Sequence, residues 1–223
     1  MRNARIIIAD DHILLLEAFS RLLEPEFEVV GTFGDGRTLL ANALQLNPDL
    51  IVLDISMPLL NGLDAGRRLK ELMPEVKLVY LTMNLDPDLA AEAFRLGAAG
   101  YIVKNSSASE LSHAIREALR GRFYVTPMLT KGLVGSFICN LDRSKRSGKL
   151  TLRQREVLQL LAEGLSMKEV GSLLEISTRT VAFHKYTMME QLQIRTNAEL
   201  IQFAIENSIG SYQSSASLRA NQL

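Results

Sequence analysis

The chain has 223 residues, of which 47% are hydrophobic, and its 25 basic and 25 acidic side chains give a formal net charge of zero. This composition is typical of a globular protein, and the length allows one large domain or two small ones. No apolar run is long enough to span a membrane, and the N-terminus does not resemble a signal peptide. The single cysteine, Cys139, excludes an internal disulfide and a thiolate metal site, so we expect a reducing, cytoplasmic location without membrane association.

The charge is divided unevenly along the chain. Residues 1–121 carry 12 Lys and Arg against 17 Asp and Glu, whereas residues 122–223 carry 13 against 8. An acidic half joined to a basic half indicates two domains with different partners. We predict a first domain over 1–121, a linker over 122–148, a second domain over 149–210 and a disordered tail over 211–223.

The acidic half shows alternating strand and helix patterns. Segments of helical spacing separate short β-branched runs, which lie at 5–9, 28–32, 50–53, 77–81 and 101–103. Two of the helices have marked starts, at Asp86-Pro87 and at Ser107…Glu110. Strands that alternate with helices predict an α/β fold with a five-stranded parallel sheet covered on both faces.

Five polar residues directly follow strands of this predicted sheet: Asp10, Asp11, Asp54, Thr82 and Lys104. Because the carboxyl ends of parallel strands meet at one edge, we expect these side chains to converge. Three close carboxylates repel one another and require a cation, and oxygen ligands alone favour Mg²⁺. Asp54 could then attack a phosphoryl group, whose oxygens would pair with Lys104 and accept a hydrogen bond from Thr82. Taken singly, each residue could instead be a loop-capping aspartate or a surface lysine.

Four motifs in this half, IIIADDH, LIVLDISMPLLNGLD, LVYLTM and AAGYIVK, resemble the receiver domain of bacterial two-component response regulators. The resemblance covers about residues 3–121 and implies a flavodoxin-like α/β receiver. It also implies phosphorylation at Asp54 by a sensor histidine kinase. The Mg²⁺ ligands that it implies are Asp10, Asp11, Asp54 and the main-chain carbonyl of Ser56.

The same resemblance implies a switch made of Thr82, Tyr101 and Lys104. In the family, the residue at Thr82 moves toward the new phosphoryl group and the aromatic at Tyr101 turns inward, which biases a two-state element. Without the motif, Tyr101 would be read as ordinary half-buried packing. Two residues depart from the family pattern: Met83 is expected to crowd the phosphoryl pocket or slow attack by water, and Asn105 replaces a frequent proline.

The basic half is predicted to be all α-helical, with four helices. Three helix starts have capping-box spacing, at Thr151…Gln154, Ser166…Glu169 and Thr196…Glu199, and Gly164 is placed to end the first helix. Only Glu175-Ile176-Ser177 separates the second helix from the third. Two short helices joined by a three-residue turn are typical of a helix-turn-helix, whose second helix enters the major groove of DNA.

The third helix of this half has a candidate DNA-binding face. Its apolar positions Val181, Met188 and Leu192 indicate the core side, which leaves Arg179, Ala182, Phe183 and Tyr186 on the opposite side, flanked by His184 and Lys185. Side chains suited to phosphate contacts are Lys168, Thr178, Thr180 and Lys185, while Ala182, Phe183, Tyr186 and Arg179 could reach base edges. Alternatively, Phe183 and Tyr186 pack against a neighbouring helix.

Residues 149–209 closely resemble the LuxR-type DNA-binding domain of NarL/FixJ regulators. The resemblance implies DNA as a partner, phosphates near Thr180 and His184, and a dimer contact through the last helix. Ala182 and Tyr186 stand where lysine is common in relatives, and Gly171 stands where alanine is common, which we interpret as a small packing residue. Together the two halves predict a phosphorylation-controlled transcription factor that is a homodimer when phosphorylated.

Other classes fit less well. A haloacid-dehalogenase-type enzyme needs a second aspartate two residues after the nucleophile, where this chain has Ser56, so we do not expect an enzyme. A flavin-binding module needs a hydroxyl- or glycine-rich phosphate loop after the first strand, where this chain has Asp10-Asp11-His12. A nearer alternative is a DNA-binding regulator of the same architecture that is controlled by protein or ligand contacts rather than by phosphorylation.

Overall fold

The structure is a computed structural model that describes residues 3–135, 150–207 and 209. These residues form two compact units, which we describe separately. Residues 136–148 of the predicted linker and the whole predicted tail lie outside the described residues. Within the described part of the chain, no helix is long and apolar enough to cross a membrane.

The first unit is built on a parallel sheet in the order β2-β1-β3-β4-β5-β6. Its strands are β1 (Arg5–Ala9), β2 (Glu28–Phe33), β3 (Leu50–Asp54), β4 (Lys77–Thr82), β5 (Gly100–Val103) and β6 (Tyr124–Val125). Every neighbouring pair is parallel, as the alternation of strands and helices predicts. The central strands are buried on both faces, which explains why they are continuous β-branched runs rather than alternating ones.

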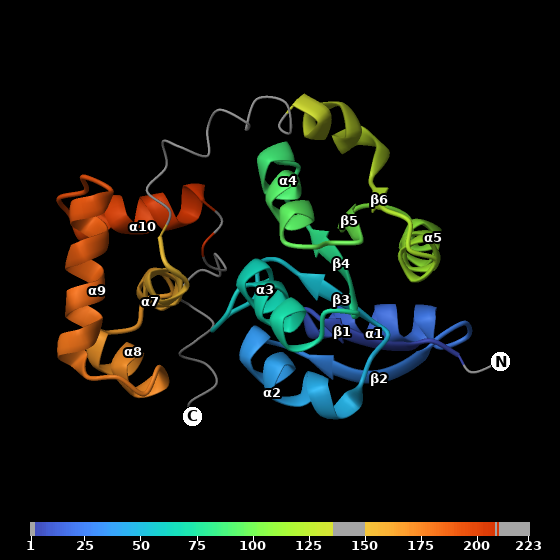
Figure 1. Ribbon diagram of the computed structural model, residues 1–223, viewed down its shortest axis with the longest axis horizontal. Helices are drawn as coiled ribbons and strands as arrows, with labels where there is room; N and C mark the ends of the chain where they lie inside the picture. The colour runs from blue at the N-terminus through green and yellow to red at the C-terminus, as the bar shows by residue number, and fades with distance from the viewer. Residues whose placement is uncertain (1–2, 136–149, 208, 210–223) are drawn as a thin grey trace. The chain divides into compact units, whose positions relative to one another are not determined.

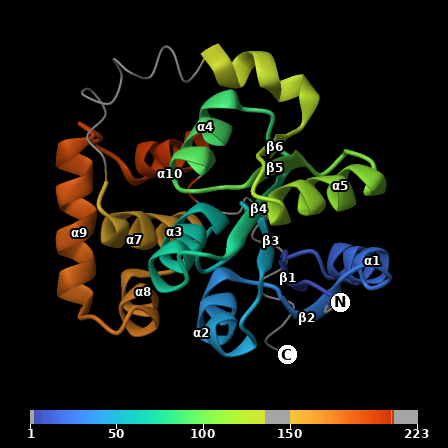
Figure 2. The same cartoon turned by 45° about the vertical axis from the view of Figure 1, so that its right-hand side comes forward.

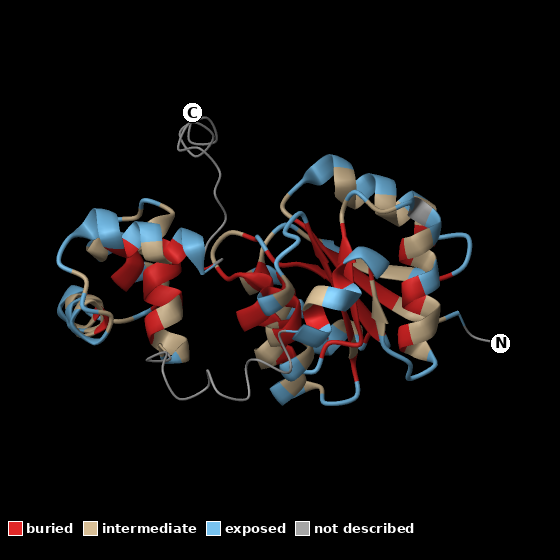
Figure 3. Cartoon of the chain, turned by 90° about the horizontal axis from the view of Figure 1, so that it is seen from above, coloured by how far each residue is buried: buried red, intermediate tan, exposed pale blue. Residues whose placement is uncertain are grey.

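Helices cover both faces of this sheet, as predicted (Figure 1, Figure 2). On one face, α1 (Ile13–Leu23) and α5 (Ala108–Leu119) pack against Ile6 and Ile8 of β1. On the other face, Ile7 belongs to the core under α2 (Gly36–Leu46), α3 (Gly62–Leu72) and α4 (Pro87–Arg95). Figure 3 shows the resulting layers, with buried strands between helices that are exposed on their outer side.

The prediction of a five-stranded sheet is wrong, because β6 adds a sixth strand within the predicted linker. The main-chain N–H of Tyr124 donates to Ala99 at 3.0 Å, and that of Thr126 donates to Tyr101 at 3.0 Å. A 3₁₀ helix, η1 (Pro127–Leu129), follows. A two-residue strand has no side-chain periodicity of its own, so the pattern could not reveal it.

The second unit contains α7 (Leu152–Ala162), α8 (Met167–Leu173), α9 (Thr178–Gln191) and α10 (Asn197–Glu206). All three predicted capping boxes, at Thr151, Ser166 and Thr196, are present. Gly164 has a φ of +91°, which suits the residue that ends α7. The four-helix prediction is therefore confirmed, with the helix starts where the capping residues place them.

The turn between α8 and α9 depends on a close approach at Gly171. A Cβ at this position would lie 2.8 Å from the carbonyl oxygen of Ile176, closer than real Cβ contacts allow. Ser177 caps α9, since its hydroxyl accepts from the main-chain N–H of Thr180 at 3.0 Å. The small residue at position 171 thus lets α8 pack directly on the turn, in agreement with the prediction of a packing role.

Candidate phosphoacceptor site and nucleic-acid interface

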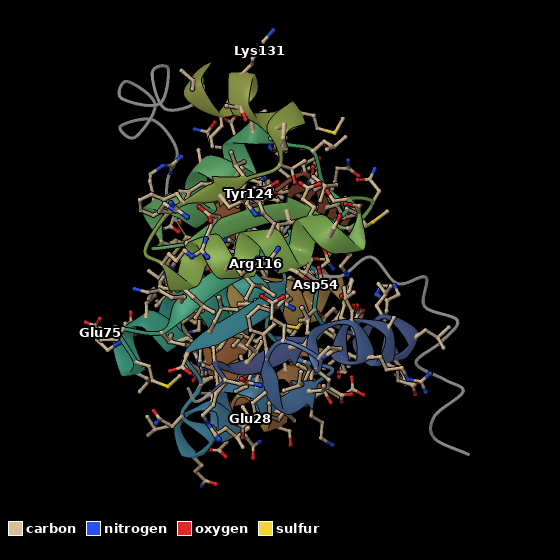
Figure 4. All side chains as sticks on the ribbon, turned by 90° about the vertical axis from the view of Figure 1, so that its right-hand side faces the viewer. Glu28, Asp54, Glu75, Arg116, Tyr124 and Lys131 are labelled. Carbon is tan, nitrogen blue, oxygen red and sulfur yellow. The ribbon has the colours of Figure 1, made fainter. Side chains whose placement is uncertain are left out.

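The polar residues that follow the strands meet at the carboxyl edge of the sheet. Asp10 follows β1, Asp54 ends β3, Thr82 ends β4 and Lys104 follows β5. In Figure 4, Asp54 and Glu75 lie apart, because Asp54 ends β3 whereas Glu75 precedes the start of β4. The parallel topology therefore brings together residues that are far apart in the sequence.

Lys104 joins two of the acidic side chains. Its Nζ lies 2.8 Å from Oδ2 of Asp10 and 2.9 Å from Oδ2 of Asp54. The side chains are almost completely buried, with 4% of Lys104, none of Asp10 and 2% of Asp54 exposed. Buried charges persist only when they are paired, so the lysine holds both carboxylates in place.

Asp11 and His12 complete an acidic cluster that we define as Asp10, Asp11, His12 and Asp54. Ligand atoms of all four residues lie within 4.8 Å of one another. The imidazole Nδ1 of His12 lies 2.8 Å from Oδ1 of Asp11 and 3.1 Å from Oδ1 of Asp10. His12 is not among the predicted site residues, although its position directly after Asp11 is a usable signal.

The electrostatics of the acidic cluster favour proton or cation binding. Burial raises the pKa of Asp54, and the carboxylate of Asp10 adds to this effect while Lys104 opposes it. Burial also raises the pKa of Asp11, against the opposing influence of His12. Burial alone would lower the pKa of Lys104. The negative charge of Asp54 and the hydrogen bonds of the lysine with Asp10 and Asp54 outweigh burial, so the pKa of Lys104 is raised.

The cluster fits a divalent cation. Three carboxylates face a single ammonium group, which leaves an excess of negative charge in a buried place. A cation coordinated by oxygen ligands would offset that charge. The main-chain carbonyl of Ser56 as a further ligand stays a prediction, since no contact of this carbonyl is established.

The loop after β3 folds back on the acceptor strand at Gly62. Its main-chain N–H donates to the carbonyl oxygen of Ile55 at 2.9 Å. A Cβ at Gly62 would lie only 2.0 Å from the carbonyl oxygen of Asp54, so no other residue fits without moving this loop. Gly62 therefore shapes the turn after Asp54 for a steric reason.

Two of the three candidate switch residues, Thr82 and Lys104, are joined through the main chain. Thr82 is buried, and its hydroxyl accepts from the N–H of Asn84 at 2.9 Å. The main-chain N–H of Lys104 donates to the carbonyl of Thr82 at 2.7 Å. Tyr101 is fully buried rather than half-buried. Met83 is 71% exposed, so its side chain does not fill the pocket as expected from the sequence.

The second unit presents two aromatic side chains of α9 to solvent. Phe183 is 66% exposed and Tyr186 is 61% exposed, so neither packs against a neighbouring helix. Val181 and Met188, on the opposite side of α9, are fully buried. Nζ of Lys185 lies 5.5 Å from the centre of the Tyr186 ring, a cation–π arrangement. Exposed aromatic rings beside a positive charge are suited to contact with DNA.

The candidate DNA-contact residues lie in the first turns of α9, except Lys168, which lies in α8. Lys168, Thr178 and Arg179 are exposed, whereas Thr180, Ala182, His184 and Lys185 are partly exposed. The hydroxyl of Thr180 lies 2.8 Å from that of Ser177, so it contributes to the helix cap. The N-terminus of a helix offers main-chain N–H groups and a partial positive charge to an anion.

Comparison with known families decides the identity of the two units. Residues 6–116 match the response regulator receiver domain, and residues 148–204 match the bacterial regulatory proteins of the LuxR family. The chain is 34% identical over 213 residues to the oxygen regulatory protein NreC of Staphylococcus carnosus, and the match covers 92% of this chain and 98% of NreC.

The chain is a response regulator of the NarL/FixJ family.

Solved structures agree with this assignment. The response regulator is similar to RcsB of Salmonella enterica serovar Typhimurium bound to the promoter rprA with a phosphomimetic, with 26% identity and a TM-score of 0.61. It is also similar to a structure of two RcsB dimers bound to two parallel DNAs, with 26% identity and a TM-score of 0.56. Each match covers 91% of this chain and 98% of the RcsB chain. The response regulator is thus a phosphorylation-dependent, DNA-binding regulator of transcription.

Proposed function

We propose that the response regulator accepts a phosphoryl group on Asp54 from a sensor histidine kinase. An oxygen of the Asp54 carboxylate forms a bond to phosphorus while the phosphorus–nitrogen bond of the phosphohistidine breaks, and the electron pair leaves with the imidazole nitrogen. The observation that supports this proposal is the contact of Lys104 with both Asp10 and Asp54. It holds the acceptor carboxylate beside a positive charge that can pair with the incoming phosphoryl oxygens.

Mg²⁺ is the cation proposed for the acidic cluster. Its ligands would be Asp10, Asp11, Asp54 and the carbonyl of Ser56, and the ion would offset the charge of the phosphoryl group when bound. Among the chain's own residues, Lys104 orients the buried acceptor Asp54, and Asp10 is fully buried and accepts a main-chain hydrogen bond from His12 at 3.0 Å.

The proposed switch consists of Thr82, Tyr101 and Lys104. The hydroxyl of Thr82 would donate to a phosphoryl oxygen and leave its hydrogen bond with Asn84. Lys104 is tied to Thr82 by a main-chain hydrogen bond, so a shift at one residue reaches the other. The negative charge added at Asp54 would thereby shift the equilibrium between two arrangements of the carboxyl ends of β4 and β5.

The proposed output is DNA binding through α9. Lys168, Thr178, Thr180, His184 and Lys185 would contact phosphates, while Arg179, Ala182, Phe183 and Tyr186 would lie toward base edges. The exposed rings of Phe183 and Tyr186 support this assignment, since apolar side chains in the major groove can contact thymine methyl groups. The phosphorylated form would bind paired half-sites as a homodimer, and the protein would act in the cytoplasm.

A labelling experiment tests the acceptor. The full-length protein, incubated with acetyl phosphate and Mg²⁺, should become phosphorylated, as measured by phosphate-affinity electrophoresis. Asp54→Asn removes the nucleophile and should abolish labelling. Asp88→Asn, which changes an exposed carboxylate in the first turn of α4, is the matched control and should be labelled like the natural protein. Equal labelling of the Asp54→Asn variant would refute the proposal.

A binding experiment tests the DNA face. Binding of the full-length protein with a phosphoryl mimic should weaken steeply with salt, because phosphate contacts release counterions. Lys185→Ala should weaken binding to all sequences alike, whereas Phe183→Ala should change the preference between sequences selected from a random pool. The assignment of Phe183 to base edges is wrong if its replacement leaves the selected sequence unchanged.

A further inference from the structure

His12 is the one member of the acidic cluster that offers a nitrogen atom. Its Nδ1 lies 2.8 Å from Oδ1 of Asp11 and 3.1 Å from Oδ1 of Asp10. The proposed Mg²⁺ site uses oxygen ligands only, so it gives this imidazole no role. The side chain is 58% exposed and can therefore adjust its position without disturbing the core.

The direction of the ring is set by the two carboxylates that precede it and not by a helix cap, since Nδ1 lies within hydrogen-bond distance of Asp10 and against Asp11. His12 occupies the N-cap position of α1, but its side chain makes no capping hydrogen bond. Its main-chain N–H donates to Oδ1 of Asp10, which needs no imidazole. The ring instead lies against two carboxylates that belong to the proposed cation site.

The spacing of these atoms matches that of neighbouring ligands on one cation. Two adjacent ligand atoms of an octahedral ion, each about 2.1 Å from the metal, are about 3.0 Å apart. The two distances from Nδ1 of His12 to the carboxylate oxygens of Asp10 and Asp11 lie on either side of that value. The imidazole can thus join the carboxylates as a ligand with little movement.

We propose that His12 supplies a nitrogen ligand to the cation pocket and makes it selective for a first-row transition-metal dication over Mg²⁺. Imidazole suits such ions, and affinity for a mixed nitrogen and oxygen site rises from Mn²⁺ to Co²⁺ and beyond, whereas Mg²⁺ prefers oxygen. The inference rests on the proposed cation site at Asp10, Asp11 and Asp54.

Isothermal titration calorimetry of the full-length protein with MgCl₂, MnCl₂ and CoCl₂ tests this selectivity. His12→Phe keeps an aromatic ring but removes the nitrogen, and it should weaken Co²⁺ binding roughly tenfold while Mg²⁺ binding stays nearly constant. His113→Asn replaces an exposed histidine of α5 and is the matched control, with affinities like those of the natural protein. Pulsed electron paramagnetic resonance of bound Mn²⁺ should show a nitrogen coupling that His12→Phe removes.

The outcomes separate this inference from the proposed function. An unchanged ratio of Co²⁺ to Mg²⁺ affinity in His12→Phe, or a missing nitrogen coupling in the natural protein, overturns the role of His12 and leaves the Mg²⁺ site intact. Stronger Mg²⁺ binding in His12→Phe also overturns it, because the imidazole would then compete with the cation. Failure of all three cations to bind the natural protein overturns both proposals.

Discussion

At the scale of single residues, two glycines show how the chain accommodates large or rigid neighbours. Gly62 allows the loop after β3 to touch the main chain of Asp54. Gly66 in α3 faces the hydroxyl of Tyr80, which is fully buried in β4 and has no hydrogen-bond partner within the described residues. Burial raises the pKa of Tyr80, so this hydroxyl stays neutral at physiological pH.

The pairing of Gly66 with Tyr80 predicts a double-mutant result. A Cβ at Gly66 would lie 1.9 Å from the Tyr80 hydroxyl oxygen, so Gly66→Ala should overpack this site and destabilise the receiver by about 1–3 kcal/mol. Tyr80→Phe removes that oxygen and should relieve most of the cost of Gly66→Ala. Urea denaturation of the four proteins, followed by circular dichroism, measures the coupling. Purely additive effects would show that the two positions do not interact.

At the scale of elements, β6 is attached to the switch end of β5 through Thr126. Its hydroxyl donates to Oε1 of Glu110 at 3.0 Å and accepts from the main-chain N–H of Val103 at 3.2 Å. Ser107 caps α5, as the sequence predicts, but the contact with Thr126 engages the carboxylate of Glu110, which the capping-box spacing had assigned to Ser107. Tertiary contact thus redirects a side chain whose local role looked settled.

Replacement of Thr126 tests this attachment. Thr126→Val keeps the shape but removes the hydroxyl, which leaves the Val103 N–H and the Glu110 carboxylate without this partner. Loss of a buried hydrogen-bond partner costs about 1–3 kcal/mol, and Thr126→Ser should restore most of it. Thermal unfolding gives the stabilities, and hydrogen exchange at the Val103 amide shows whether the site itself opens. Equal stability of the Val and Ser variants would contradict the structural role of the hydroxyl.

At the scale of the whole molecule, three strands, β1, β3 and β5, bring the acidic cluster and Lys104 together at one place. Burial raises the pKa of both Asp11 and Asp54 above the ordinary value of 3.8. Without a cation, the folded state holds protons on these groups more tightly than the unfolded chain does. Their contribution to stability therefore falls as the pH rises from about 3.8 through the raised pKa values.

This linkage predicts how Mg²⁺ affects stability at different pH values. A cation binds the ionised carboxylates, so Mg²⁺ at roughly 100 times its Kd should stabilise the folded state by about 2.7 kcal/mol near neutral pH. The effect should shrink as the pH falls through the raised pKa values of Asp11 and Asp54. Differential scanning calorimetry of the natural protein and of Asp11→Asn checks this. A shift in Tm that persists in Asp11→Asn, or that does not depend on pH, would argue against the cation site.

Features that depend on local chemistry and on side-chain periodicity can be predicted from the amino-acid sequence. Capping residues such as Ser166 and Thr196 satisfy the first N–H groups of their helices, and continuous β-branched runs require a sheet that is buried on both faces. The parallel topology then predicted that Asp10, Asp54 and Lys104 would meet, and the contacts of Lys104 confirm it. Three features became evident only in the folded chain: β6 joins the sheet, His12 lies against the carboxylates and Met83 is exposed to solvent. Strand pairing depends on neighbours from distant parts of the chain, and the direction of a side chain depends on the packing around it, so local spacing encodes neither.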